Sequence, residues 1–267
     1  MGHAIEALPK GVKNVQRNPM LFLIGFGVLL AMVPLLIVGG IIAIIAAFVP
    51  VVGQLIARLV VAVPLKTLLL GGMVGAAGAG FAGSVSFGDY TSAVRDNFAS
   101  LAGAFALYEV VLFVFGIGFG IVFFFVFGLG SALMAPTGDS TAAMAGLGFG
   151  MIAVAIAAVV LIFLYAVVFQ FLDVAVVLGG KDATGAFKES WRLTREAPLS
   201  VLGYTVMRGL IGGVILLPGY FVALVGGHFS DVLTLVGVAV VVLLYPIAFT
   251  VLMSYHAAYY GVRLQAS

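Results

Sequence analysis

The chain has 267 residues, of which 64% are hydrophobic and 8% are charged, with a net charge of +2 and no cysteine. A water-soluble protein cannot bury that much apolar surface, whereas lipid tails solvate it, so the composition indicates an all-α polytopic integral membrane protein. The small net charge argues against a nucleic-acid partner, and the lack of cysteine excludes disulfides, thiolate chemistry and cysteine-ligated metals.

Apolar segments alternate with short polar connections along the chain. The polar N-terminus precedes an apolar run too long for a removable signal peptide, so we expect this run to be retained as a first membrane span. Five further segments reach the roughly 20 residues that a membrane-spanning helix needs. The stretch 50–58 is either an interfacial turn or the beginning of the second span. The predicted spans are 20–48, about 50–81, 101–130, 144–178, 199–225 and 232–260, with a turn at 131–143.

Lysine and arginine residues gather in the N-terminus, in the second and fourth connections and in the C-terminal tail. With six spans, these four regions lie on one side of the membrane. Cytoplasmic segments are enriched in Lys and Arg, so we expect a multi-pass protein of the cell membrane with both termini in the cytoplasm. Arg58 is the exception, since the predicted topology puts it at the opposite edge.

Residues 182–198 hold the only tryptophan and the densest cluster of charge in the chain. Helical spacing places Phe187 and Trp191 on one face, and Glu189 and Arg192 on the other. We therefore expect a short amphipathic helix whose aromatic face lies at the headgroups and whose cations face anionic lipid phosphates. A soluble protein is the alternative partner for this helix. The residues expected to make these contacts are Lys188, Trp191, Arg192 and Arg195.

The second connection resembles the fourth, since residues 89–98 align without gaps on residues 182–191. The N-terminus is a weaker copy. We therefore predict one membrane domain, 1–267, built of three helix-pair repeats, each a cytoplasmic amphipathic helix followed by two spans. Asp89 and Asp182 are expected to cap their helices, and a proline opens the next span in the first and third units. The repeats cover approximately 1–86, 87–180 and 181–267.

The run Ala186-Phe-Lys-Glu-Ser-Trp-Arg-Leu, followed by a proline and a new span, resembles a pattern in uncharacterised six-span prokaryotic membrane proteins. These include the membrane domain attached to some glycerophosphodiester phosphodiesterases and the UPF0259-like proteins. The resemblance implies a six-helix membrane module. It implies no established activity and no site residues.

Four ionisable side chains at membrane depth, Lys66, Glu109, Asp173 and Arg208, form the candidate polar site, because such groups are costly in lipid and mark functional positions. Glu109 and Arg208 lie at nearly the same depth of their repeats, so an ion pair between them is our leading prediction. The alternative pairs Lys66 with Glu109 and leaves Arg208 near Asp173. These groups form either satisfied internal pairs or a ligand or ion pathway. His256 lies among tyrosines that fit an interfacial aromatic belt.

No catalytic, metal-ligating or nucleotide-binding motif is present, so we expect neither an enzyme nor a cofactor nor a metal site. The first functional expectation is non-enzymatic binding or transport of a small or amphipathic molecule between the repeats. The alternative is a scaffold or accessory subunit whose cytoplasmic helices dock lipid headgroups or a soluble partner. A lipid-modifying enzyme would need a nucleophile and a base that the sequence does not identify.

Overall fold

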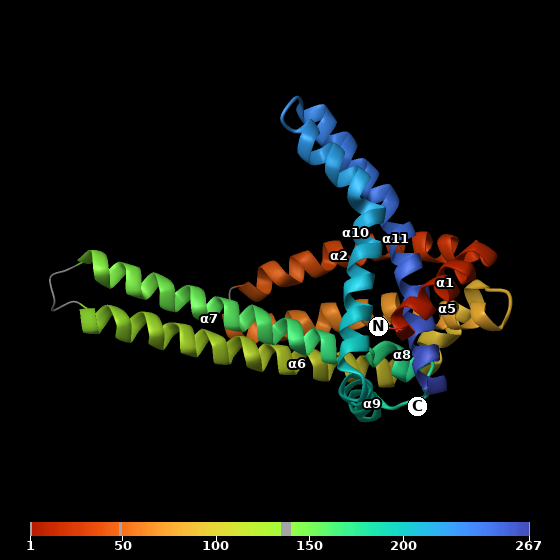
Figure 1. The fold of residues 1–267 in the computed structure, drawn as a ribbon, viewed down its shortest axis with the longest axis horizontal. Helices are drawn as coiled ribbons and strands as arrows, with labels where there is room; N and C mark the ends of the chain where they lie inside the picture. Colours follow the sequence, from red (N-terminus) through yellow and green to blue (C-terminus); the bar gives the residue numbers. More distant parts are fainter. Residues whose placement is uncertain (1, 48–49, 135–139, 267) are drawn as a thin grey trace.

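The computed structural model describes residues 2–47, 50–134 and 140–266, and these ranges are helical apart from short turns (Figure 1). No strand occurs in them, so the predicted all-α class is confirmed. The helices and two π-helical turns, η1 and η2, are α1 (Gly2–Arg17), α2 (Met20–Ala47), α3 (Pro50–Ala57), η1 (Arg58–Ala62), α4 (Val63–Lys66), η2 (Thr67–Gly71), α5 (Gly72–Ala82), α6 (Phe87–Met134), α7 (Ser140–Val168), α8 (Leu172–Val177), α9 (Ala183–Glu196), α10 (Pro198–Gly226) and α11 (Asp231–Ala266).

Six segments of the described chain are long and apolar enough to cross a membrane. The second runs from α3 to α5, so the stretch that begins at Pro50 belongs to a helix and is not an interfacial turn. Residues 135–139 of the predicted turn lie outside the described part of the chain. The six segments are Met20–Ile42, Val52–Ala82, Phe87–Val126, Gly150–Val177, Pro198–Gly226 and Asp231–Ala266.

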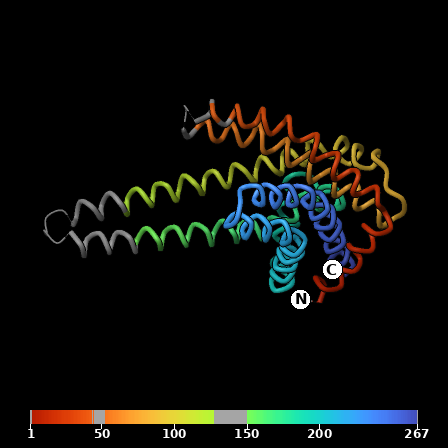
Figure 2. Tube along the Cα trace, turned by 90° about the horizontal axis from the view of Figure 1, so that it is seen from above, coloured from red at the N-terminus to blue at the C-terminus, as the bar shows by residue number. Residues whose placement is uncertain are grey.

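The long helices form hairpins that diverge from a common body (Figures 1 and 2). Helices α6 and α7 extend together in one direction, and α10 and α11 extend in another. The body contains α1, α5, α8 and the C-terminal end of α11, and both chain ends lie there. Within it, α1 packs along α11, and α9 packs on α8.

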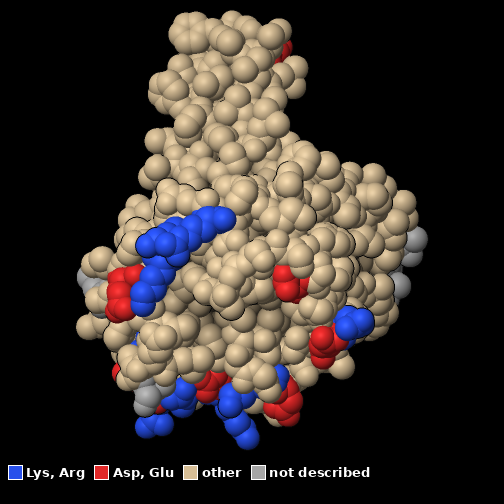
Figure 3. Space-filling model, turned by 90° about the vertical axis from the view of Figure 1, so that its right-hand side faces the viewer, with Lys and Arg blue, Asp and Glu red and all other residues tan. Residues whose placement is uncertain are grey.

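Large apolar side chains are exposed on the diverging hairpins. Phe124 of α6 and Leu224 of α10 are each 71% exposed, and Phe229 in the turn before α11 is 78% exposed. Exposed apolar area costs about 25 cal/mol per Å² in water, and lipid removes that cost. Figure 3 agrees with this, since the protruding upper part is nearly free of charge while charged side chains gather lower down. The six apolar helices are therefore compatible with a multi-pass membrane protein.

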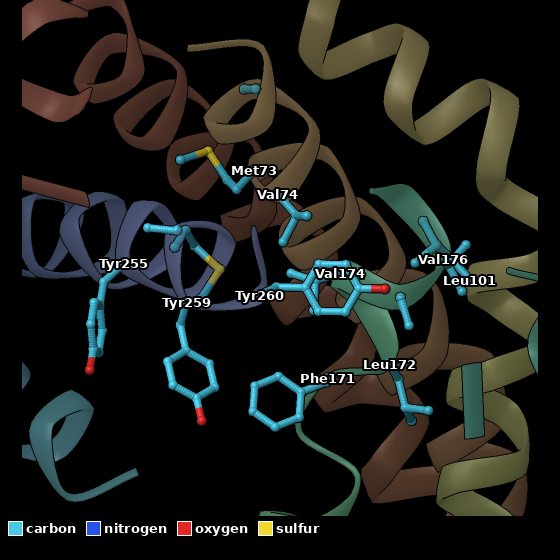
Figure 4. Packing of buried hydrophobic residues seen from close by; sticks show 14 of the residues in the cluster. Met73, Val74, Leu101, Phe171, Leu172, Val174, Val176, Tyr255, Tyr259 and Tyr260 are labelled. Atoms are coloured by element: carbon cyan, nitrogen blue, oxygen red, sulfur yellow. The ribbon is translucent and has the colours of Figure 1, made fainter. Parts of the chain in front are cut away.

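The core of the body is built from aromatic rings of α10, α11 and the turn before α8. Tyr259 stacks on Phe171 and on Tyr204, with ring centroids 5.7 Å and 4.4 Å apart. Figure 4 shows Phe171 and Tyr259 side by side. The three tyrosines that flank His256 on α11 are at most 1% exposed, because α1, α8 and α10 cover this end of α11. The predicted interfacial aromatic belt is therefore wrong at this position.

Helix α1 is held against the body by close backbone approach and by hydrogen bonds. Gly11 lies so near α11 that a Cβ there would meet the Cα of Tyr255 at 2.7 Å. The Asn14 amide donates to the carbonyl of Ala77 at 2.9 Å and to the Ser254 hydroxyl at 2.8 Å. These contacts tie α1 to α5 and α11, so protein covers its inner face.

The three predicted short helices do not join their spans in the same way. Helices α1 and α9 end just before Pro19 and Pro198, whereas residues 87–98 continue directly into the third span as part of α6. A proline disfavours helical backbone at the residue that precedes it, and the second connection has no proline at this point. The prediction of a separate second short helix is therefore wrong.

The two aligned aspartates also act differently at their helix starts. Asp182 is the N-cap of α9, and its carboxylate accepts a hydrogen bond from the Gly185 N–H at 2.7 Å, as predicted. Asp89 instead lies inside the first turn of α6, where it accepts from the Ser86 N–H at 2.7 Å. The Ser86 hydroxyl in turn accepts from the Asp89 N–H at 3.3 Å. This reciprocal pair is a capping box in which Ser86, and not Asp89, is the N-cap.

Helix α9 buries a different face from the predicted one. Its buried side chains are Ala186, Glu189, Ser190 and Leu193, whereas Trp191 is 53% exposed. The prediction that placed Glu189 on the outer face is therefore wrong. The reason is that α9 packs on α8 and α6 through a small and partly polar surface.

Candidate functional site

Three of the four predicted polar residues line one pocket of about 190 Å³ inside the bundle. It lies between the second, third, fourth and fifth apolar segments. The fourth residue, Glu109, does not line this pocket but is joined to it through Lys66. The lining residues are Lys66, Leu70, Phe105, Tyr108, Ala166, Phe169, Gln170, Leu172, Asp173 and Arg208.

Glu109 is the centre of an ion-pair cluster on one side of this pocket. Its buried carboxylate accepts a hydrogen bond from Arg58 Nη1 at 3.1 Å and a second from Lys66 Nζ. The Lys66 ammonium also lies 4.8 Å from the centre of the Tyr108 ring, a cation–π geometry. The predicted Glu109–Arg208 ion pair is therefore wrong, and the alternative pairing with Lys66 is found. Arg58, which the predicted topology places at the opposite edge, is a second partner of Glu109 that the sequence pattern does not predict.

The helix that carries Arg58 and Lys66 departs twice from α-helical geometry. The π-helical turns η1 and η2 lie on either side of α4, which contains Pro64. At the end of η1 the Val63 N–H donates to the Arg58 carbonyl, five residues earlier. Proline has no N–H and crowds the preceding turn, which accounts for a wider turn at this place. Single π-helical turns are frequent at functional sites.

The fourth apolar segment is broken beside the pocket, between Val168 and Leu172. The freed carbonyl of Val168 accepts hydrogen bonds from the hydroxyls of Ser190 at 2.7 Å and Thr194 at 3.3 Å. The Phe171 N–H donates to the same Ser190 hydroxyl at 3.3 Å. Irregular backbone at membrane depth persists only where protein or a cavity satisfies it. Helix α9 therefore stabilises the break in what the sequence predicted as one uninterrupted span.

Asp173, just after this break, belongs to a buried chain of hydrogen bonds. Its Oδ1 lies 3.0 Å from His256 Nε2 and accepts from the Val174 N–H at 2.9 Å. On the other side of the ring, His256 Nδ1 is bonded to the Tyr204 hydroxyl. An ionised Asp173 accepts only, so Nε2 of His256 carries a proton and donates a hydrogen bond to the Asp173 carboxylate. The sequence pattern does not predict Asp173 and Tyr204 as the partners of His256.

Arg208 lies at the boundary between this pocket and a second, more open one of about 450 Å³. No ion pair within 4.0 Å involves Arg208 in the described part of the chain, although it interacts electrostatically with Asp173 and Tyr204. Gln170 also lines both pockets, and its amide donates to the Thr205 hydroxyl at 3.0 Å. The second pocket is lined by Phe163, Ala166, Val167, Gln170, Thr205, Arg208, Gly209, Gly212 and Leu252.

The α9 residues predicted to contact headgroups or a partner differ in their exposure and in their hydrogen bonds within the helix. Arg192 is half-buried and donates to Glu189 at 2.7 Å and to Glu196 at 3.1 Å. The hydrogen bond with Glu189 is the main reason why the pKa of Arg192 is raised above its usual value. Lys188, Trp191 and Arg195 are exposed. The carboxylates of α9 itself therefore occupy Arg192, and the other three side chains face outward.

These features define a class: a helical protein with six apolar segments long enough to span a membrane and a pocket with charged side chains between four of them. Residues 3–262 match a family model described as "Domain of unknown function (DUF7847)", so the chain belongs to this family. No curated protein and no solved structure matches it. The expected membership in an uncharacterised family is thus confirmed, while no named relative supports the similarity to the phosphodiesterase membrane domain or to the UPF0259-like proteins.

Proposed function

We propose that this protein is a non-enzymatic integral membrane protein that binds and moves a small or amphipathic molecule within the helix bundle. The single observation that carries the proposal is the junction at Arg208 and Gln170. Both residues line the first pocket, here called the polar pocket, and also the second, larger pocket, here called the apolar groove. Ligand sites combine an apolar lining with a few polar groups that fix orientation, and this junction has both.

The arrangement of the buried hydrogen bonds favours binding over catalysis. Tyr204 and His256 are 0% exposed, and neither lines the pocket. Asp173 reaches the pocket, but its Oδ1 already accepts from His256 and from a backbone N–H. A catalytic acid or base must reach the reacting group within hydrogen-bond distance. The chain of Tyr204, His256 and Asp173 therefore serves to hold α8, α10 and α11 together at the pocket wall.

Filling the apolar groove tests this proposal. A Cβ at Gly209 would meet no atom within 4 Å, so the side chain of Gly209→Leu would enter the groove without a clash at its base. The control is Gly118→Leu, which is also open around its Cβ and lines neither pocket. The protein would be placed in lipid nanodiscs and titrated with fluorescent single-chain amphiphiles of several headgroups. Weaker binding to Gly209→Leu alone supports the proposal, and equal binding to all three proteins contradicts it.

A second function is favoured by the outward side chains of α9. Lys188, Trp191 and Arg195 are exposed beside the body, a pattern suited to anionic headgroups or to a soluble partner. The protein would then act as a scaffold or accessory subunit. The test is a pull-down from gently solubilised membranes with the wild-type protein and with Trp191→Ala combined with Arg195→Ala. A stoichiometric partner that is lost from the double variant supports this function.

The proposal also keeps the predicted topology and repeats. Both termini would be cytoplasmic, and the units 1–86, 87–180 and 181–267 would each contribute an amphipathic helical stretch followed by two spans. Support comes from the positive charge of α1 and α9 and from the proline that follows each of these helices. The similarity to the phosphodiesterase membrane domain and to the UPF0259-like proteins belongs to the same proposal.

A further inference from the structure

We propose that the ligand is a bilayer lipid whose headgroup is anionic and carries no cationic group, with the headgroup on Arg208 and an acyl chain in the apolar groove. This inference rests on the proposed function, and it adds the chemical class of the molecule. It is argued from the charge around the pocket, from the place of Arg208 and from the groove beside it.

The charged groups at the polar pocket leave a positive surplus. The three cations are Arg58, Lys66 and Arg208, and the two carboxylates are Glu109 and Asp173, which gives a balance of +1. Glu109 is shared by Arg58 and Lys66. A neutral His256 leaves this balance unchanged and a protonated His256 adds to it, so the pocket has a positive surplus in both cases. A surplus cation inside a bundle is costly unless an anion is supplied, so the pocket favours one negative charge.

Arg208 is placed to receive that charge. It is the one cationic residue that lines both the polar pocket and the groove as the structure describes them. A guanidinium offers five N–H donors in a planar fork that matches the oxygens of a phosphate or carboxylate. Gln170 also lines both pockets, but its amide already donates to the Val167 carbonyl and to the Thr205 hydroxyl, so Arg208 is the proposed donor to the anion. A headgroup bound to Arg208 would therefore have its anionic oxygens in the polar pocket and its chain directed into the groove.

The groove fits an acyl chain better than a polar molecule. Its walls include Phe163 of α7, Gly209 and Gly212 of α10 and Leu252 of α11, and it is wide open at the outer surface of these helices. That surface is apolar, since Val159, Val206 and Leu210 nearby in sequence are each more than half exposed. A lipid would enter sideways from the bilayer without carrying its chain through water.

The charge balance also distinguishes between lipid classes. A choline or ethanolamine headgroup would bring an ammonium group close to Lys66 and Arg208, where like charges repel. The polar pocket, at about 190 Å³, offers little room to turn such a group away. A headgroup that ends in a phosphate or phosphoglycerol has no such conflict. We therefore expect anionic lipids to bind more tightly than zwitterionic lipids of the same chain length.

The test uses the full chain in nanodiscs of phosphatidylcholine with traces of fluorescent phosphatidylglycerol, phosphatidic acid or phosphatidylcholine. Wild-type protein is compared with Arg208→Gln and with Arg95→Gln, a control at an exposed arginine of α6 that lines neither pocket. A third variant, Arg195→Gln, tests the outward surface of α9. Loss of a charged hydrogen bond to the headgroup weakens binding about tenfold or more. We expect this loss for the two anionic lipids with Arg208→Gln and no change with Arg95→Gln. A thermal unfolding midpoint for each variant shows whether it is folded.

Two results would overturn the inference, and they separate it from the proposed function. If Arg195→Gln weakens binding and Arg208→Gln does not, the anionic lipid lies at the headgroup surface and not in the pocket. If all three lipids bind equally and only Gly209→Leu weakens them, the groove binds amphiphiles but does not select their charge. In that case the proposed function is supported, and the inference that the ligand is an anionic lipid is wrong. If neither Gly209→Leu nor Arg208→Gln has an effect, both proposals fail.

Discussion

The imidazole Nε2 of His256 lies 3.0 Å from the Oδ1 of Asp173, although 83 residues separate them in the chain. Phe171 stacks on the same imidazole with ring centroids 5.6 Å apart and an interplanar angle of 11°. The contact joins the C-terminal half of α11 to the short helix α8. It therefore holds Asp173, which lines the polar pocket, against α11.

Removal of this contact should destabilise the body of the protein. We expect His256→Leu to lower stability by about 1–3 kcal/mol, because it leaves the buried Asp173 carboxylate without one of its donors. Tyr204→Phe should cost less, and its effect should be smaller still in the His256→Leu background, since the two residues share one hydrogen bond. The measurement is the unfolding midpoint in detergent. Tyr245→Phe, at a half-exposed position of α11, is the control and should leave the midpoint unchanged.

Glu109→Gln should destabilise the protein by about 2 kcal/mol, because it leaves Lys66 and Arg58 facing a neutral amide. A second change, Lys66→Met, should recover part of this loss, since it removes one of the two uncompensated cations. Arg208→Met should recover less, because Arg208 is not paired with Glu109. Unfolding midpoints of the two double variants decide between the pairings. A larger recovery with Arg208→Met would instead support an ion pair between Glu109 and Arg208 and would contradict the pairing seen in the structure.

Ser190→Ala should loosen the break between α7 and α8. Its hydroxyl donates to the Val168 carbonyl and accepts from the Phe171 N–H, so we expect a loss of about 1–2 kcal/mol. The amide of Phe171 should also exchange its hydrogen faster. Thr194→Val is the comparison with a smaller expected effect. The Thr194 hydroxyl reaches the Val168 carbonyl only at 3.3 Å, and it also donates to the Ser190 carbonyl at 3.0 Å. Equal effects of the two changes would show that the Ser190 hydroxyl does not hold the break.

The predicted orientation can be measured with single cysteines, since the natural chain has none. Thr184→Cys lies on α9, and His228→Cys lies in the exposed turn between α10 and α11. We expect a membrane-impermeant maleimide added to intact cells to label position 228 and to reach position 184 only after permeabilisation. Labelling of both positions in intact cells, or of position 184 alone, would refute the cytoplasmic placement of α9.

Some features follow from local sequence because they depend only on neighbouring residues. Six long apolar runs predict six long helices whatever their partners are, since each run satisfies its own backbone hydrogen bonds. The Asp182 cap of α9 and the helix ends before Pro19 and Pro198 are equally local. The same local pattern wrongly predicts a separate second short helix. Residues 89–98 align with 182–191, but no proline follows them to end the helix, so they continue into α6.

The identity of the partners at membrane depth was decided only by the tertiary structure. Depth in the bilayer predicted that Glu109 would meet a cation, and the choice among Lys66, Arg58 and Arg208 depended on how the helices rotate about their axes. The π-helical turns on either side of Lys66 change that rotation, and no local composition rule predicts them. In the same way, the burial of His256 required α1, α8 and α10 to cover one end of α11. Local sequence thus determines which segments are helical and apolar, whereas the relative rotation and packing of those helices determine which polar groups meet.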